Sequence, residues 1–227
     1  MKALVLFSGG IDSTTALALA INKYGKDRVI ALSVSYGQKH DKEIQAAIAV
    51  AEYYGVEHLF LDLRKIFTYS NCSLLKQSTE KIPEESYAKQ ISKTNGETPV
   101  STYVPFRNGL FLSSAASIAL SKECGVIYYG AHADDSAGFA YPDCSPVFNR
   151  AMNEAIWEGS GHQLKIEAPF VNVSKAEVVR IGLELNVPYE LTWSCYEGGE
   201  KPCGKCGTCI DRAAAFQANH VEDPALQ

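Results

Sequence analysis

The sequence has no long hydrophobic run. Its N-terminal apolar stretch spans only 3–7 and ends in Ser8-Gly9-Gly10, whereas a membrane-spanning helix needs about 18 or more consecutive apolar residues. No apolar stretch elsewhere approaches that length. We therefore expect a cytoplasmic protein that is neither secreted nor embedded in a membrane.

Positive charge is also scarce. The 227 residues include 21 Lys and Arg against 26 Asp and Glu, a net charge of −5, which argues against the broad basic surface that grips nucleic-acid backbones. Small anionic substrates remain compatible with this charge. Hydrophobic residues make up 46% of the chain, which is enough apolar material for a folded core. The length predicts one core domain with extensions.

Internal repeats and low-complexity tracts are absent, and short apolar runs instead alternate with helical patterns. In the first third we expect strands at 2–7, 29–35 and 56–63, and helices at 14–21 and 41–54. This βαβαβ order predicts a parallel sheet with right-handed crossovers and helices on both faces. Nucleotides bind such sheets at the carboxyl ends of the strands, where the first strand meets its helix.

Residues 66–103 interrupt this pattern. Ser, Lys, Glu, Gln and Thr dominate the segment, so we interpret it as a long, partly helical excursion and a candidate lid. Regular elements then resume, and Ser174-Lys175-Ala176-Glu177 has the form of a helix-starting capping box. The expected elements are a helix at 106–123 that Gly125 ends, a strand at 126–130, a helix opened by Ser145-Pro146, a weak strand at 164–168, and a helix that starts at Lys175 and is stopped by Asn186 and Pro188.

Seven cysteines are an odd number, and four of them lie close together near the C-terminus. Their pattern, C-x7-C-x2-C-x2-C, is typical of metal ligands, and Gly204 and Gly207 ease the tight turns. Four thiolates form a closed tetrahedral site, which predicts structural Zn²⁺; an iron–sulfur cluster and unligated core cysteines are the alternatives. The predicted ligands are Cys195, Cys203, Cys206 and Cys209, in a segment at 191–227 that follows a main domain at 1–190.

A glycine turn follows the first expected strand. In Ser8-Gly9-Gly10-Ile11-Asp12-Ser13, the glycines expose backbone N–H groups beside the N-terminus of the next helix, and serine hydroxyls flank them. These groups together can bind phosphate. The segment matches neither the P-loop pattern G-x-x-x-x-G-K-[ST] nor G-x-G-x-x-G, and a plain tight turn is the alternative interpretation.

The string S-G-G-x-D-S after an apolar strand resembles the signature of the PP-loop ATP pyrophosphatase family. The resemblance implies a parallel-sheet, adenine nucleotide alpha hydrolase-like α/β fold of three layers, here with a small C-terminal zinc knuckle of four cysteines. It also implies that ATP is cleaved between its α- and β-phosphates, that a substrate oxygen is adenylated and that pyrophosphate is released. The ATP-binding residues would be Ser8, Gly9, Gly10, Ile11, Asp12, Ser13, Thr14 and Arg107.

Three charged or titratable residues are candidates for catalysis. Asp12 could help to place Mg²⁺ beside the pyrophosphate, or it could merely interact favourably with a helix dipole. Lys175 resembles the lysine of the S/T-K-x-E segment in this superfamily and could neutralise phosphate charge, although a solvated lysine is the alternative. His132 could assist proton transfers, and a structural histidine is equally compatible with the sequence.

Five further polar segments indicate one branch of this family. Together they are similar to the 7-cyano-7-deazaguanine synthase branch of the PP-loop family, from Lys2 to about Phe216. Lys39 stands where arginine is expected, and the excursion at 66–103 carries no assignable motif, which leaves substrate detail open. The segments that carry the resemblance are 36–40, 104–108, 130–144, 192–196 and 202–206.

This branch implies conversion of 7-carboxy-7-deazaguanine to the nitrile in queuosine precursor synthesis. ATP and Mg²⁺ would activate the carboxylate and then the amide, and free ammonia would supply nitrogen. Asp143 would accept hydrogen bonds from the guanine-like edge, and Tyr141 or Phe139 would stack on the ring. The resemblance also implies a homodimer that acts on small molecules and has no direct nucleic-acid partner.

Two other functions stay open. A PP-loop tRNA sulfurtransferase would also adenylate its substrate, and would need a reactive thiol from Cys72, Cys124 or Cys144. The net negative charge counts against it. A non-catalytic nucleotide-binding protein that uses the zinc knuckle as a partner surface is the second alternative.

Overall fold

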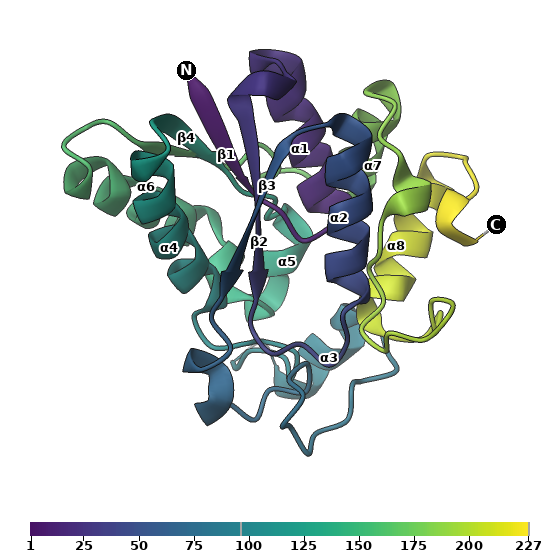
Figure 1. Cartoon of the computed structure of the whole chain (residues 1–227). Helices are drawn as coiled ribbons and strands as arrows, with labels where there is room; N and C mark the ends of the chain where they lie inside the picture. The colour runs from purple at the N-terminus through teal and green to yellow at the C-terminus, as the bar shows by residue number, and fades with distance from the viewer. Residues whose placement is uncertain (96, 227) are drawn as a thin grey trace.

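A five-stranded parallel sheet forms the centre of the computed structural model, which describes residues 1–95 and 97–226. The strand order is β3-β2-β1-β4-β5 (Figure 1). β1 pairs with β2 on one side and with β4 on the other, so the chain changes direction along the sheet at β1. The strands are β1 (Lys2–Leu6), β2 (Val29–Ser35), β3 (Glu57–Asp62), β4 (Cys124–Tyr128) and β5 (Lys165–Glu167).

Helices cover both faces of the sheet and form three layers (Figure 1). Alternate residues of β1 belong to different cores: Ala3 and Val5 pack with α1, α2, α7 and α8, whereas Leu4 and Leu6 pack with α4 and α6. This division explains why β1 is apolar at every position from 3 to 6 rather than at alternate ones. The helices are α1 (Ile11–Tyr24), α2 (Lys42–Tyr54), α3 (Tyr87–Thr94), α4 (Arg107–Ser121), α5 (Ala133–Ser136), α6 (Pro146–Gly159), α7 (Lys175–Glu184) and α8 (Gly207–Ala218).

The predicted fold class and the alternating order of elements are confirmed. β2 has the predicted bounds. Two predicted helix starts also agree, because Ser145 Oγ accepts a hydrogen bond from the Phe148 N–H and Ser174 Oγ accepts one from the Glu177 N–H, which satisfies N–H groups at the helix N-termini. No helix in the described ranges has both the length and the apolar character needed to cross a bilayer.

The predicted end of α4 is wrong. Gly125 does not end this helix but lies inside β4, which also begins two residues earlier than the expected strand at 126–130. The helix ends at Ser121, and Glu123 makes the turn in the left-handed region with φ of 59°. A glycine was therefore not needed at the turn, although it is the commoner choice there.

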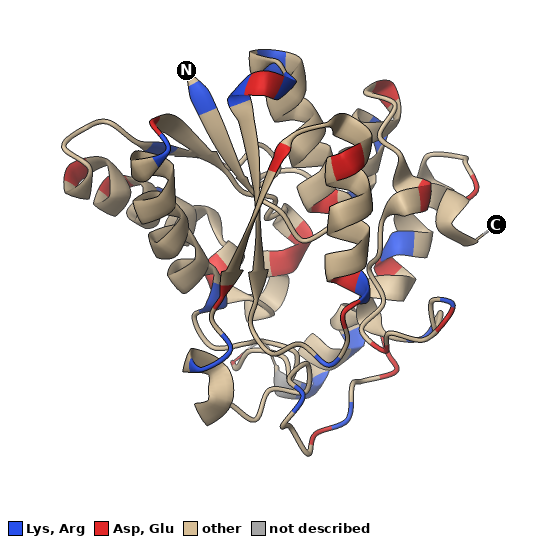
Figure 2. Cartoon of the chain, viewed as in Figure 1, with Lys and Arg blue, Asp and Glu red and all other residues tan. Residues whose placement is uncertain are grey.

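The excursion at 66–103 contains α3 and a short 3-10 turn at Ile66–Tyr69. It lies beyond the carboxyl ends of the strands, below the arrowheads in Figure 1. Its buried side chains, among them Phe67 and Leu75, pack in a third small core with Tyr36 and with three of the clustered cysteines. The excursion thus contacts the C-terminal cysteine segment. Figure 2 shows that acidic and basic residues are interspersed along the chain.

Candidate active site

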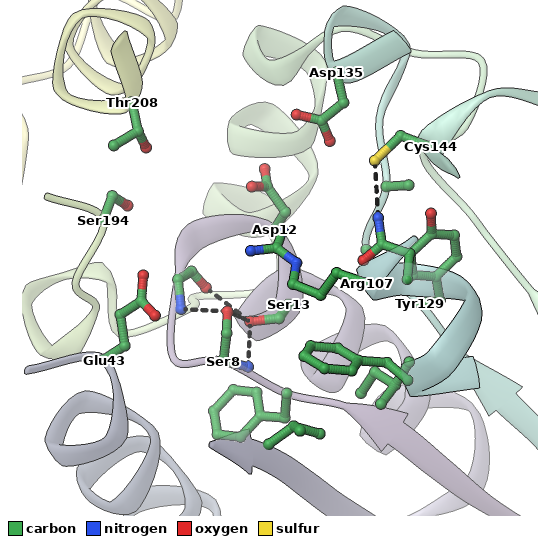
Figure 3. Close-up of a pocket in the computed structure, with 18 of the residues that line it drawn as sticks. Ser8, Asp12, Ser13, Glu43, Arg107, Tyr129, Asp135, Cys144, Ser194 and Thr208 are labelled. Atoms are coloured by element: carbon green, nitrogen blue, oxygen red, sulfur yellow. Dashed lines mark hydrogen bonds between the residues drawn. The ribbon is translucent and has the colours of Figure 1, made fainter. Parts of the chain in front are cut away.

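A pocket opens at the carboxyl ends of β1, β2 and β4, beside the position at which the strand order reverses. Its walls come from the N-terminal parts of α1 and α4, from the loop after β4, and from the segment that carries the clustered cysteines (Figure 3). Ligands of open α/β sheets bind at this position because two loops diverge there and leave a crevice.

The glycine turn between β1 and α1 forms one end of the pocket. Gly9 has φ of 80°, and a Cβ atom there would lie 2.5 Å from the Ala47 N atom and 2.8 Å from the Glu43 carbonyl oxygen. Only glycine fits this close approach to α2. Gly10 begins α1 without a side-chain cap, so the N–H groups of the first turn are available to an anionic ligand.

Two serines hold the turn in shape. Ser13 Oγ accepts a hydrogen bond from the Ser8 N–H at 3.2 Å, and the two hydroxyls are 3.1 Å apart (Figure 3). The Gly9 carbonyl also accepts from the Trp193 N–H at 3.0 Å. Both serine side chains line the pocket. Three further residues predicted to bind ATP, Gly9, Ile11 and Thr14, are buried and are not among the described residues that line it.

Asp12 and Lys175 form an ion pair at the floor of the pocket. Lys175 Nζ lies 2.7 Å from Asp12 Oδ2, although the two residues are 163 positions apart. Burial raises the pKa of Asp12, but the neighbouring Lys175 ammonium and His132 outweigh it and lower the pKa overall. Asp12 Oδ1 is buried and has no hydrogen-bond partner. The solvated-lysine alternative is therefore wrong, because the Lys175 side chain is only 11% exposed.

His132 lies beside this pair with a side chain that is 3% exposed. Its Nε2 is 3.4 Å from Lys175 Nζ and 3.3 Å from Asp135 Oδ1. The neighbouring Asp134 accepts a hydrogen bond from the Lys175 backbone N–H, so the loop after β4 and the start of α7 are tied together. Three residues predicted separately from sequence, Asp12, His132 and Lys175, thus meet in one cluster.

Three acidic residues of the pocket, Glu43 of α2, Asp135 and Asp211, were not singled out from sequence. Asp135 belongs to a loop that sequence did indicate, whereas Asp211 lies on α8 among the cysteines. Burial raises the pKa of Asp211, while Lys175 and His132 act in the opposite direction. The available signal for Asp211 was its position two residues after Cys209, on the same helix as a predicted metal ligand.

The opposite end of the pocket is aromatic and contains Arg107. The Arg107 guanidinium carbon lies 5.1 Å from the centre of the Tyr36 ring and 6.0 Å from that of Phe111. Tyr87 of α3 and Tyr196 also line this end, and their hydroxyl oxygens are 2.7 Å apart. Burial lowers the pKa of Arg107, but interactions with Tyr36, Tyr196 and others outweigh it and raise the pKa overall.

The three residues predicted to contact a deazaguanine ring lie outside this lining, among the residues that the structure describes. Asp143 is buried, and its Oδ2 accepts a hydrogen bond from the Asn108 N–H at 2.9 Å, which stabilises the start of α4. The Tyr141 hydroxyl is 2.6 Å from Thr102 Oγ1. Phe139 is 63% exposed. Their contact with substrate stays a prediction.

The four clustered cysteines are arranged to bind a metal ion. One Sγ atom from each lies within 4.8 Å of all the others, and tetrahedral Zn–S bonds of about 2.3 Å would place sulfurs about 3.8 Å apart. Backbone N–H groups of Cys203 and Glu197 point to Cys195 Sγ at 3.3 and 3.4 Å. Such donors stabilise thiolates, so the donor set fits a tetrahedral cation. The members are Cys195, Cys203, Cys206 and Cys209.

The family model of queuosine biosynthesis protein QueC matches residues 2–220. A 7-cyano-7-deazaguanine synthase of Archaeoglobus fulgidus is 42% identical over 227 residues, which cover 100% of this chain and 90% of that protein. A 7-cyano-7-deazaguanine synthase of Marinomonas sp. is 43% identical over 98% of this chain and 96% of its own.

A solved structure shows the same fold at low sequence identity. NMN synthetase from Francisella tularensis aligns with a TM-score of 0.51 and 15% identity, and the alignment covers 97% of this chain and 78% of that chain. At this identity the likeness concerns the arrangement of strands and helices and not the reaction.

Proposed function

The chain belongs to the family of queuosine biosynthesis protein QueC, and from that premise we propose that it is a 7-cyano-7-deazaguanine synthase, an ATP-dependent enzyme that converts a deazaguanine carboxylate and ammonia to the nitrile. One observation carries the proposal in this chain. A single pocket joins a glycine turn at an uncapped helix N-terminus and the Asp12–Lys175 pair to an aromatic end that contains a cation. Such a pocket can hold ATP and a planar, negatively charged heterocycle side by side.

The chemistry requires activation of oxygen twice. A carboxylate resists attack by ammonia because oxide is a poor leaving group, so one carboxylate oxygen attacks the α-phosphorus of ATP and pyrophosphate leaves. Ammonia then displaces AMP and gives the amide. In the second round the amide oxygen attacks another ATP and pyrophosphate leaves again. Loss of AMP and of the nitrogen-bound protons produces the nitrile. This sequence needs no protein nucleophile, only positioning and charge stabilisation.

The glycine turn would bind the phosphates. Its free N–H groups and the hydroxyls of Ser8 and Ser13 are the donors, and the Lys175 ammonium would balance charge that develops on the leaving pyrophosphate. Asp12 Oδ1, which is buried and unpartnered, is a suitable oxygen ligand for Mg²⁺. When bound there, Mg²⁺ would supply Lewis-acid stabilisation of the phosphate charge. His132 is near enough to Lys175 to exchange protons with it.

We propose structural Zn²⁺ in the cysteine cluster, because four sulfurs leave no coordination position for a substrate. The enzyme would act as a cytoplasmic homodimer on small molecules, without direct contact with nucleic acid.

The experiment is to incubate zinc-loaded protein with ATP, Mg²⁺, ammonium and 7-carboxy-7-deazaguanine and to measure AMP and the mass of the deazaguanine. We expect AMP formation that depends on the carboxylate, with conversion to the nitrile. Formation of AMP without the nitrile would support adenylation, but it would contradict either the conversion of the amide to the nitrile or the choice of 7-carboxy-7-deazaguanine as the substrate. Absence of AMP from folded, metal-loaded protein would contradict the synthase proposal.

The environments of the other cysteines disfavour a tRNA sulfurtransferase. Burial raises the pKa of Cys72, of Cys124 and of Cys144, which opposes formation of a nucleophilic thiolate. Only Cys144 lines the pocket among the described residues. A variant with all three replaced by alanine should keep synthase activity, provided that circular dichroism shows it folded. Complete loss of turnover in that folded variant would instead favour a thiol-dependent reaction.

A further inference from the structure

No carboxylate of the described residues lies within ion-pair distance of Arg107, and Glu43 and Asp143 interact with its charge only at longer range. Lys175 is paired with Asp12, and Arg212 with Asp223. No ion pair within 1–95 and 97–226 involves Arg107, although Arg107 lines the pocket. A buried or half-buried cation is costly unless an anion compensates it. The missing anion is therefore expected to belong to a ligand.

The surroundings of Arg107 favour a planar anion. The rings of Tyr36 and Phe111 pack against the guanidinium, and such stacking restricts its orientation while its N–H edge stays available. In Figure 3 the side chain of Arg107 reaches into the pocket. A guanidinium edge matches a carboxylate with two parallel hydrogen bonds, and both groups are flat.

Two anions could occupy this position, an ATP phosphate or the substrate carboxylate. The phosphate end already has the N-terminus of α1, the serine hydroxyls and Lys175. Arg107 enters instead from α4, in the company of Tyr36, Phe111 and Tyr196, which are suited to a flat heterocycle. Resting on the function proposed above, we propose that Arg107 binds the carboxylate of the deazaguanine substrate, and not ATP, so that it selects the acid for the first adenylation.

This assignment separates the two adenylation rounds. The first substrate is an anion, and its carboxylate forms charge-assisted hydrogen bonds with the guanidinium. The second substrate is a neutral amide whose oxygen accepts only an ordinary hydrogen bond from the same group. Hydrogen bonds between charged partners are stronger than those with one neutral partner. Arg107 thus matters more for the acid than for the amide.

The test supplies 7-carboxy-7-deazaguanine and the corresponding amide separately to the zinc-loaded enzyme and measures kcat/KM for AMP release. In Arg107→Gln we expect a loss of about 100-fold with the acid and of about threefold with the amide, with the KM for ATP unchanged. Arg107→Lys keeps the charge but loses the paired donors, so it should fall between these values with the acid. Calorimetry without ATP should show the same preference in binding.

Arg150→Gln is the matched control, because Arg150 is exposed on α6, outside the pocket. It should leave both reactions unchanged. Equal losses for acid and amide in Arg107→Gln, with a raised KM for ATP, would assign Arg107 to the nucleotide and overturn the inference. Unchanged kinetics in that variant would overturn it as well. If the unmodified enzyme converts neither compound, the proposed function fails before the role of Arg107 is reached.

Discussion

Glu43 shows how one side chain can carry a pH dependence in this pocket. Burial raises the pKa of Glu43 to about 7 from 4.5, although Arg107 opposes the shift. A carboxyl with a raised pKa binds its proton more tightly in the folded chain than in the unfolded one. Its contribution to the free energy of unfolding therefore falls as pH rises from about 4.5 to about 7.

Glu43→Gln should remove the fall in free energy of unfolding that Glu43 causes as pH rises. The shift corresponds to at most about 3 kcal/mol, and to about 2 kcal/mol once partial exposure is considered. Relative to the unmodified protein, the variant should gain about 2 kcal/mol in free energy of unfolding between pH 5 and pH 8, measured by denaturant titration of metal-loaded protein. Glu52→Gln, an exposed change on the same helix, is the control. A difference independent of pH would contradict the raised pKa.

Gly9→Ala tests the close approach of the glycine turn to α2. The new Cβ would lie 2.5 Å from a backbone nitrogen, and φ of 80° is unfavourable for alanine. We expect a loss of about 2 kcal/mol in stability and at least a tenfold weaker affinity for ATP, measured by calorimetry. Gly159→Ala has open space around the added atom and should change neither quantity. Unaltered ATP affinity in Gly9→Ala would show that this turn does not bind phosphate.

At the scale of elements, the bounds of a helix or strand could be predicted where neighbouring residues in the sequence determine them. The run at 29–35 predicts β2 with its observed bounds because 29–32 are consecutive apolar residues, as in a strand buried on both faces. Ser174 marks the start of α7 through a local hydrogen bond. The end of α4 was missed because Glu123 adopts a conformation that usually favours glycine. No helix was expected at 207–218, where the cysteine spacing dominated the interpretation of the sequence.

For the site as well, sequence indicated the residues that belong to contiguous motifs and missed those that only the fold brings together. The glycine turn and Lys175 were found because each belongs to a contiguous motif beside a helix N-terminus. The aromatic end was not found as a unit, since Tyr87 comes from the excursion and Tyr196 from the cysteine segment. These two residues are 109 positions apart, and no spacing rule links them. Only the tertiary structure shows that the excursion contributes Tyr87 to the lining of the pocket.

The contact between α3 and the cysteine segment can be measured by a double-mutant cycle. The Tyr87 and Tyr196 hydroxyl oxygens are 2.7 Å apart, and Tyr87 packs on Gly207. For Tyr87→Phe and Tyr196→Phe we expect a coupling of about 1 kcal/mol in the free energy of unfolding. Each variant should also speed proteolysis within 66–103. Tyr69→Phe, at a residue that is 95% exposed, is the control. Additive effects would show that the two hydroxyls do not interact in solution.

At the scale of the whole molecule, α8 connects the metal site to the pocket. Cys206 caps this helix and Cys209 lies in its first turn, while Thr208 and Asp211 line the pocket. The far end of α8 is held separately, because Ala215 and Phe216 pack in the core with α1 and α7. Losing the metal should therefore loosen the first turn of α8 while the sheet stays folded.

Metal removal should for this reason reduce ATP binding before it unfolds the protein. Four thiolates brought together without a cation repel one another, and binding of the metal provides the free energy that holds this segment folded. After chelation we expect faster hydrogen exchange at 195–211 and at least tenfold weaker affinity for ATP, with little change in β1 and β2. Cys203→Ser should reproduce this pattern, whereas Cys124→Ala, outside the cluster, should keep the metal. Full ATP affinity in metal-free protein would contradict this prediction, because α8 would then keep its pocket residues in place without the metal. Simultaneous loss of exchange protection throughout the sheet would also contradict it, because the metal would then stabilise the entire fold.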